Sequence, residues 1–355
     1  MGNGLEIGFY GNKIKSIQFL RAFAIIFVMI EHVSYWGFGA FGVDIFFVIS
    51  GFVMMYSSHM DDVTKGYRKS LKTFLPKKLL RIIPLYYLMT IITYVAVCIF
   101  PEYFRQTERG FMQVIKSFLF IPYESGGRTM PIVKVGWCLN YEVVFYLIFF
   151  IAIMISYKYR GIIASAVMIA LSVSGYLVTT ESIPVRFWLG DVYLDFVYGI
   201  IAYYICLTTH KAFLTIRQKK GLKVALIIVF AACVCGITAT LIMGHRIVGD
   251  DLNPIRGISW GIPAFIIFML FFWTGILMDI PKIFVWIGDI SFTLFLIHYY
   301  PVMFFSRIGE GIQNGFLRVL LALAGFVLAF AVSVPVHFLF DKKISGKIAV
   351  FLKKI

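Results

Sequence analysis

Residues 16–36, SIQFLRAFAIIFVMIEHVSYW, form an apolar run that is long enough to cross a bilayer as a helix, and this run decides the fold class. The run carries Arg21 and His32, eleven positions apart, which 3.6 residues per turn would place on one helix face. The two side chains would then lie roughly 16 Å apart along the helix axis. Ionisable groups inside a membrane usually mark a functional site or pathway. The alternative is that Arg21 reaches a lipid headgroup and His32 lies at the opposite interface.

The composition places the whole chain in the membrane class. Of its 355 residues, 60% are hydrophobic and only 14% are charged, far from the averages of a soluble domain. Spanning segments are predicted at residues 16–36, 40–57, 82–100, 134–156, 161–179, 187–207, 222–243, 258–278, 283–305 and 316–340. A further stretch, 111–123, is apolar but interrupted, and we interpret it as an interfacial or re-entrant piece. We therefore expect an all-α polytopic integral membrane protein with about ten transmembrane helices.

Lysine and arginine set the expected orientation. Alternate segments between the predicted spans, such as 65–81 and 211–223, hold most of these residues, and the opposite segments hold fewer, Arg256 among them. The positive-inside rule then places both termini in the cytoplasm. The net charge of +15 is explained by basic clusters that bind anionic lipid headgroups, without any nucleic acid. We expect residues 1–355 to form one membrane domain.

The second predicted span contains a lone aspartate. Residues 41–52 read FGVDIFFVISGF, with Asp44 in an apolar run and Ser50 and Gly51 near its end. A carboxylate inside the membrane is expected to be paired or hydrogen-bonded. The small residues let helices approach closely, which favours packing as their role.

A basic pair precedes the third predicted span. In residues 76–87, PKKLLRIIPLYY, Lys78 and Arg81 are three positions apart and would face the same way on a helix. At the cytoplasmic mouth of the span, two roles stay open for them. They would bind either the phosphates of a phosphorylated ligand or the phosphates of lipid headgroups.

Five sequence blocks, in order along the chain, resemble the membrane acyltransferase-3 family, and within it the exopolysaccharide-production O-acyltransferases. The blocks are IQFLRA at 17–22 followed by His32, residues 42–52, the RIIP turn at 81–84, GWCLNYE at 136–142 with Phe145 and Tyr146, and ISFTLFLIH at 290–298. The order of the five makes the resemblance specific, and it covers most of the chain. One departure is Lys78, which stands where the family commonly has arginine and therefore loses one bidentate fork.

The resemblance implies transfer of an acyl group, usually acetyl from acetyl-CoA, to a hydroxyl of a glycan or glycolipid. A thioester is already activated, so the enzyme must deprotonate an alcohol, align it and stabilise the developing oxyanion. Histidine suits the first task near neutral pH, and we expect His32 to be the general base with Glu142 orienting it. A covalent acyl-His32 intermediate stays open. Structural pairing of Glu142 with a basic residue is the alternative for that carboxylate.

Other members of the blocks are expected to bind the donor or to support the site. The phosphate end of the donor is expected to be held by three basic residues: Arg21, Lys78 and Arg81. Trp137 is expected to line the acyl channel. Structural or supporting roles are expected for Asp44, Ser50 and His298. We expect His298 to hydrogen-bond across helices.

The expected partners follow from this interpretation. The donor is a substrate, acetyl-CoA or another acyl-CoA such as succinyl-CoA, and we expect neither a tightly bound cofactor nor a metal site. The acceptor is a glycan or a lipid-linked glycan, selected by the predicted outside segments 101–133 and 244–257. The expected location is the cytoplasmic membrane, among membrane lipids. The sequence does not indicate an oligomeric state.

Two other functions are compatible with the same residues. A proton-coupled transporter would use Arg21, His32, Asp44 and Glu142 to relay protons or to bind an anionic solute. An inverted repeat of the spans would favour a transporter, and the sequence contains none that we recognise. A non-catalytic component of polysaccharide assembly would tolerate the loss of His32.

Overall fold

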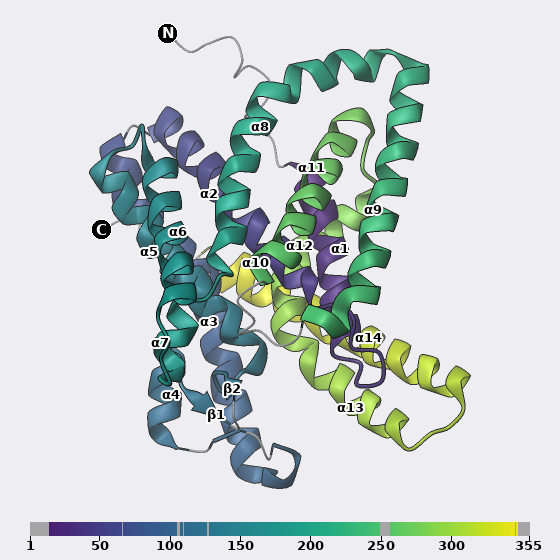
Figure 1. Cartoon of the computed structure of the whole chain (residues 1–355). Helices are drawn as coiled ribbons and strands as arrows, with labels where there is room; N and C mark the ends of the chain where they lie inside the picture. Colours follow the sequence, from purple (N-terminus) through teal and green to yellow (C-terminus); the bar gives the residue numbers. More distant parts are fainter. Residues whose placement is uncertain are drawn as a thin grey trace. The chain divides into compact units, whose positions relative to one another are not determined.

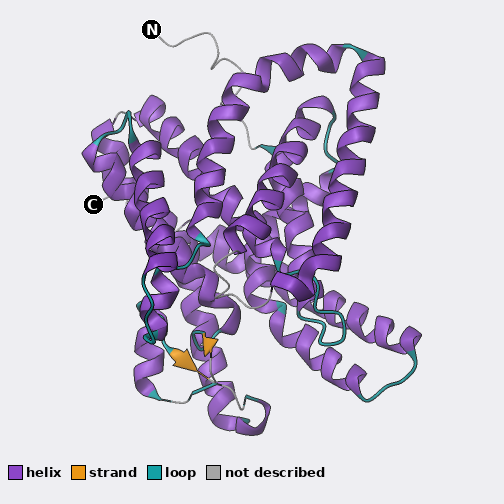
Figure 2. Cartoon of the chain, in the orientation of Figure 1, coloured by secondary structure: helices purple, strands orange, loops and turns teal. Residues whose placement is uncertain are grey.

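A computed structural model gives the fold of the chain (Figure 1). It describes residues 14–65, 67–104, 107–108, 110–125, 128–248, 256–344 and 346. The predicted outside segment 244–257 is covered only in part, because residues 249–255 lie outside the described chain. Helices dominate the described residues, and Figure 2 shows one short pair of strands among them.

The described chain divides into two compact units, each assembled from separate stretches of sequence. Unit 1 contains the chain up to Glu31, Gly37–Lys65 and Asp191–Ser291. Unit 2 contains His32–Trp36, Gly66–Gly190 and the chain from Phe292. The stretches of the two units alternate along the sequence, so the units are not successive segments of chain.

Unit 1 is built from long helices that pack around α2 and α8. Its elements are α1 (Lys15–Glu31), α2 (Phe41–Lys65), α8 (Tyr193–Gln218), α9 (Lys220–Val248), α10 (Arg256–Ser259), α11 (Gly261–Leu277) and the first part of α12 (Lys282–Ile297). Helix α2 packs most extensively against α8, and α11 packs against α1, α2 and α8. Aromatic rings fill the space between α2 and α11, where the Phe52 ring centroid lies 5.0 Å from that of Phe268.

Two glycines allow α2 and α8 to touch backbone to backbone. A Cβ atom on Gly51 would lie 2.2 Å from the carbonyl oxygen of Phe196, and one on Gly199 would lie 2.2 Å from that of Val48. Without an apolar driving force between helices in lipid, close packing at small residues is a main source of helix association. The packing role expected for the small residues of the second span is thus confirmed at Gly51.

Unit 2 combines long helices with several short elements. Its elements are α3 (Tyr67–Ile99), the 3₁₀ turn η1 (Pro101–Tyr103), α4 (Phe111–Phe118), β1 (Glu124–Ser125), β2 (Arg128–Thr129), η2 (Lys134–Gly136), α5 (Trp137–Ile155), α6 (Arg160–Leu177), α7 (Ile183–Trp188), the end of α12, α13 (Tyr299–Glu310), α14 (Gly315–His337) and the π-helical segment η3 (Phe338–Ile344). Helix α13 packs extensively against α14, and α5 packs against α3 and α6.

The helices confirm a multi-pass membrane protein. Among the described residues, eight helices are long and apolar enough to cross a membrane, and a ninth span results if the bent pair α12–α13 counts as one. The predicted first span corresponds to α1, whose 17 residues extend about 26 Å, slightly less than the hydrocarbon thickness. The count of ten spans and the cytoplasmic location of both termini therefore stay predictions.

One local expectation was wrong. Residues 81–84 do not form a turn, because α3 continues from Tyr67 to Ile99 with Pro76 and Pro84 inside it. Membrane helices tolerate such prolines when neighbouring groups satisfy the freed carbonyls. The stretch 111–123, interpreted as an interfacial or re-entrant piece, contains the 8-residue helix α4, and an antiparallel hairpin that pairs Glu124 with Thr129 follows it.

Candidate active site

The helix that carries Arg21 ends before His32. Helix α1 stops at Glu31, where the prediction continued it to Trp36. The Glu31 carboxylate explains the stop, because its Oε2 accepts hydrogen bonds from the backbone N–H groups of Gly39 at 2.6 Å and Ala40 at 3.0 Å. These donors lie directly before α2, where backbone N–H groups have no helical partner. His32 therefore lies in the turn that follows α1, and the predicted single stripe with Arg21 is wrong.

The structure brings His32 to His298, within unit 2. His298 is buried at the bend of 65° between α12 and α13. Its Nε2 lies 3.3 Å from Nδ1 of His32, and its Nδ1 lies 2.8 Å from the carbonyl oxygen of Phe295 and 3.1 Å from that of Leu294. The edge of Tyr299 packs against the His32 ring, with the ring centroids 5.3 Å apart.

These contacts fix the tautomers of both imidazoles. Carbonyl oxygens only accept hydrogen bonds, so His298 Nδ1 must carry the proton and Nε2 must hold the lone pair. His32 Nδ1 then donates to His298 Nε2, which leaves the lone pair of His32 on its own Nε2. A neutral imidazole with its lone pair on a defined nitrogen is suited to accept a proton from an alcohol.

Residues that follow His32 hold this segment on α13 and α14. The backbone N–H and the hydroxyl of Ser34 lie 2.6 and 2.7 Å from the hydroxyl oxygen of Ser306 on α13. The Tyr35 hydroxyl donates to the carbonyl oxygen of Arg318 on α14 at 2.5 Å. The segment that carries His32 is therefore held by hydrogen bonds to both helices of the α13–α14 pair.

The predicted carboxylate and tryptophan lie together on α5. The Glu142 Oε1 atom accepts a hydrogen bond from the Tyr146 hydroxyl at 2.5 Å, one turn further along the helix. The Trp137 ring packs edge-on against that of Tyr141, at a centroid distance of 6.1 Å. The group that hydrogen-bonds to His32 Nδ1 is His298, for which only a supporting role was expected.

The predicted donor-binding residues lie in both units. Lys78 and Arg81 lie three positions apart on α3 in unit 2, with Lys78 Nζ 5.6 Å above the Phe74 ring and the Arg81 side chain exposed. Arg21 lies on α1 in unit 1, where its Nε donates to the hydroxyl of Ser291 at 3.0 Å. Ser50 is half-buried on α2.

Asp44 belongs to a buried ionic cluster in unit 1. Its two carboxylate oxygens accept hydrogen bonds from Nε and Nη2 of Arg256, each at 3.0 Å, and both side chains are almost completely buried. Asp195, also buried, lies close enough to Asp44 to interact with it electrostatically. Its two carboxylate oxygens have no hydrogen-bond partner in the part of the chain that the structure describes. The nearby Asp191 accepts the backbone N–H of Gly257 at 2.6 Å.

Sequence reasoning missed the partners of Asp44. Arg256 was assigned to an outside segment because it lies between two predicted spans, yet it is the first residue of α10 and is buried. The available signal was that an embedded carboxylate requires a cation, and Arg256 directly borders an apolar run. Asp195 gave the same signal, as a single carboxylate within the apolar start of α8.

Comparisons with known proteins agree with the sequence blocks. A family model described as an acyltransferase domain, that of the acyltransferase-3 family, matches residues 14–338. Exopolysaccharide production protein ExoZ of Rhizobium meliloti is 32% identical over 167 residues, which is 46% of this chain and 50% of that protein. Peptidoglycan O-acetyltransferase OatA of Listeria monocytogenes is 32% identical over 153 residues, 39% of this chain and 24% of that protein.

The alignments with the two relatives and the match to the family model cover different shares of the chain. The aligned parts span half or less of the length of the two relatives. Among solved structures, none matches the chain. The family model, in contrast, covers most of the sequence, from α1 to the start of η3. The chain therefore belongs to the acyltransferase-3 family.

Proposed function

We propose that this protein is a membrane O-acyltransferase that moves an acyl group from an acyl-CoA to a hydroxyl of an exported glycan, with His32 as the general base. The observation that carries the proposal is the hydrogen bond between His32 and His298, which leaves the lone pair on His32 Nε2. Membership of the acyltransferase-3 family supports acyl transfer. The names of the two relatives, an exopolysaccharide protein and a peptidoglycan O-acetyltransferase, support a glycan acceptor and acetyl as the acyl group.

In the proposed reaction the two imidazoles have different roles. His32 Nε2 takes the proton of the acceptor hydroxyl while its oxygen attacks the thioester carbonyl. The tetrahedral intermediate then collapses, the carbon–sulfur bond breaks, and the coenzyme A thiolate leaves. The imidazolium of His32 returns its proton to that sulfur. Throughout, His298 Nε2 accepts a hydrogen bond from His32 Nδ1–H and stabilises the positive charge, the task that a carboxylate performs in a serine hydrolase triad.

The donor and its surroundings are proposed from the remaining residues. Lys78, Arg81 and Arg21 supply positive charge for the phosphate end of the acyl-CoA. Trp137 lines the acyl path. Glu142, held by Tyr146, is proposed to position groups around His32 rather than to accept its Nδ1 proton, because His298 occupies that nitrogen.

The deciding experiment measures acyl transfer by the purified full chain in nanodiscs. Radiolabelled acetyl-CoA is the donor and a crude lipid-linked glycan extract is the acceptor. Loss of a general base reduces the rate by roughly 10² to 10⁴, so His32→Ala is expected to transfer label at a rate lower by that factor. The control His210→Ala, on α8 of unit 1, is expected to behave as the original chain.

Two outcomes would overturn the proposal. Near-normal transfer by His32→Ala would exclude His32 as the base. If the original chain consumed neither acetyl-CoA nor succinyl-CoA, acyl transfer from coenzyme A thioesters would be excluded. Label that stays on the rapidly denatured original chain, is released by neutral hydroxylamine and is absent from His32→Ala would replace direct transfer by an acyl-histidine route.

A further inference from the structure

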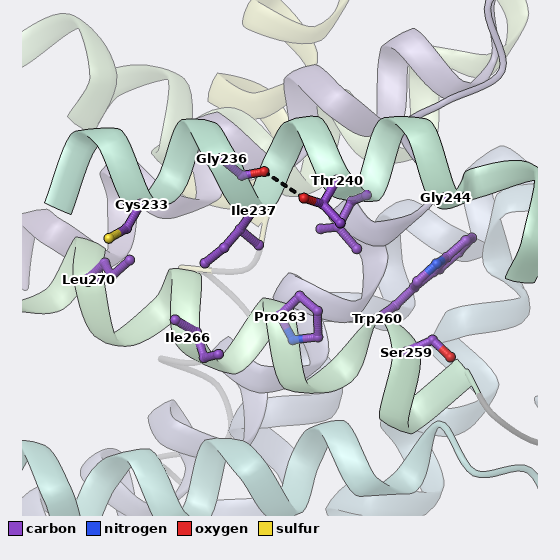
Figure 3. A pocket seen from close by; sticks show the side chains of 11 residues that line it. Cys233, Gly236, Ile237, Thr240, Gly244, Ser259, Trp260, Pro263, Ile266 and Leu270 are labelled. Atoms are coloured by element: carbon purple, nitrogen blue, oxygen red, sulfur yellow. Dashed lines mark hydrogen bonds between the residues drawn. The ribbon is translucent and has the colours of Figure 1, made fainter. Parts of the chain in front are cut away.

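A groove lies between α9 and α11, within unit 1. Its volume is about 600 Å³, within the range of small-molecule sites. One wall consists of α9 residues, including Gly236 and Gly244, and the other of α11 residues, including Pro263 and Leu270 (Figure 3). The lining is overwhelmingly apolar, so water has few partners there.

The glycines of α9 have no side chains, and this leaves space along that wall of the groove. A Cβ atom built on Gly236 or on Gly244 would meet no atom within 4 Å. Helix α9 is also the most peripheral of the candidate spans, because only 11% of its apolar window is buried inside the protein. A groove beside such a helix is accessible to the hydrocarbon chains of the bilayer.

The volume of the groove fits a single lipid acyl chain better than a protein helix. A helix with side chains is about 10 Å across, so 600 Å³ would hold only about one and a half turns of it. A single aliphatic chain needs no hydrogen bonds and fills a narrow apolar groove along its length. The occupant is therefore a lipid tail rather than a second copy of this protein.

The two ends of the groove differ in polarity. Cys233 and Leu270 lie at one end, whereas Ser259 and Trp260 lie at the other, near Gly244 (Figure 3). The Trp260 indole extends toward the part of α9 that carries Gly244, and the guanidinium carbon of Arg256 lies 4.6 Å from the centroid of this ring, which makes this the more polar end. A lipid in this groove would therefore place its headgroup near Trp260.

The charges of α9 indicate which side of the membrane this end faces. Lys219, Lys220 and Lys223 cluster at the beginning of the helix, opposite Gly244. By the positive-inside rule, the beginning of α9 faces the cytoplasm and the Trp260 end faces the other side. An exported glycan is present on that other side.

We propose that the groove between α9 and α11 binds one aliphatic chain of the glycolipid that carries the acceptor hydroxyl. The glycan end of this lipid lies at Trp260, and the tail runs toward Leu270. The proposal rests on the proposed function, because it assigns the substrate class of the acceptor. The groove thereby holds the acceptor by its tail and leaves the sugar to be selected elsewhere.

The test is a binding measurement that does not depend on acyl transfer. The full chain is placed in nanodiscs of phosphatidylcholine brominated in the acyl chains, which quench nearby tryptophan. The fluorescence of Trp260 is isolated as the component lost in Trp260→Phe. Hexadecyl glucoside is then added as an unbrominated glycolipid, and unbrominated phosphatidylcholine is added separately at the same mole fraction.

Hexadecyl glucoside is expected to relieve the quenching of Trp260 at least fivefold more effectively than unbrominated phosphatidylcholine. Gly236→Leu, which fills the groove, is expected to abolish this difference. The matched control is Gly221→Leu on the same helix, where an added Cβ also meets nothing within 4 Å, and it is expected to retain the difference. His32→Ala is expected to retain it too, because the histidine does not line the groove.

Three results would overturn the proposal. Equal relief by both lipids would make the groove an ordinary site for bilayer chains. No quenching assignable to Trp260 would mean that no lipid chain enters. Relief that persists in Gly236→Leu would place the glycolipid elsewhere. A failure of acyl transfer in the original chain would overturn the proposed function and leave this binding result standing.

Discussion

Two polar clusters, one in each unit, differ in how they are completed. In unit 1, Asp44 meets Arg256 in a bidentate pair, and Asp195 adds a second carboxyl. In unit 2, His32 meets His298, and the chain of hydrogen bonds runs from two backbone carbonyls to a basic nitrogen. The first cluster pairs opposite charges, whereas the second leaves a lone pair on His32 Nε2. Burial of polar groups alone therefore does not identify chemistry, whereas the direction of the hydrogen bonds does.

The largest expected effect follows from breaking the cluster of unit 1. Arg256→Met leaves the Asp44 carboxylate buried and uncompensated, which typically costs about 3–5 kcal/mol in the free energy of unfolding. Steric trapping in bicelles measures this free energy. The double variant Asp44→Asn with Arg256→Met removes both charges, and it is expected to recover part of the loss.

A second ion pair in unit 1 supplies the control. Arg217 Nη2 lies 3.1 Å from an Asp279 oxygen, with side chains that are 42% and 84% exposed. Exposed pairs contribute at most about 1 kcal/mol, so Arg217→Met is expected to change stability little. If Arg256→Met were as mild as Arg217→Met, the buried cluster would not be the structural element that we infer.

The next effect concerns the orientation of His32 by His298. His298→Asn keeps a polar side chain near the carbonyls of α12 but removes the acceptor for His32 Nδ1, and kcat is expected to fall about 10²-fold, or about 2.7 kcal/mol. His298→Gln places an amide oxygen near the position of Nε2, so a loss below about tenfold is expected. Steady-state kinetics with acyl-CoA separates kcat from KM, and KM for the donor is expected to stay unchanged in both variants.

A purely structural role for His298 predicts a different pattern. Both variants would then lose thermal stability in parallel with activity, and the amide oxygen of glutamine would give no advantage. Equal kcat values for the two variants would exclude orientation of His32 through Nε2.

The sequence allowed the helices to be predicted better than their contacts. The hydrocarbon core demands long apolar runs, and this requirement is visible in any window of sequence, as at α5 and α14. The end of α1 could not be predicted, because the Glu31 carboxylate that stops it binds backbone groups that precede the next helix. Local periodicity contains no information about such a bond.

The candidate site shows the same limit more strongly. His32 and His298 were both singled out, yet 266 positions separate them, and nothing in their spacing indicated that they would meet. Arg256 lies 212 positions from Asp44 and was assigned to a loop. The requirement for a cation beside an embedded carboxylate was predictable, whereas the identity of that cation depended on how α2 and α10 pack.

The smallest expected effect distinguishes the two carboxyls of the cluster of unit 1. Two ionised carboxylates buried side by side would repel each other, and a single arginine, already bidentate on Asp44, compensates only one of them. We therefore expect Asp195 to be protonated. Asp195→Asn keeps a donor of the same size in the same place, so the free energy of unfolding is expected to change by less than about 1 kcal/mol. Asp44→Asn removes the counter-charge of buried Arg256 and is expected to cost about 3–5 kcal/mol by the same steric-trapping measurement. Equal costs for the two substitutions would mean that the proton is not held on Asp195, and the cluster of unit 1 would then resemble the histidine pair in having an exchangeable proton.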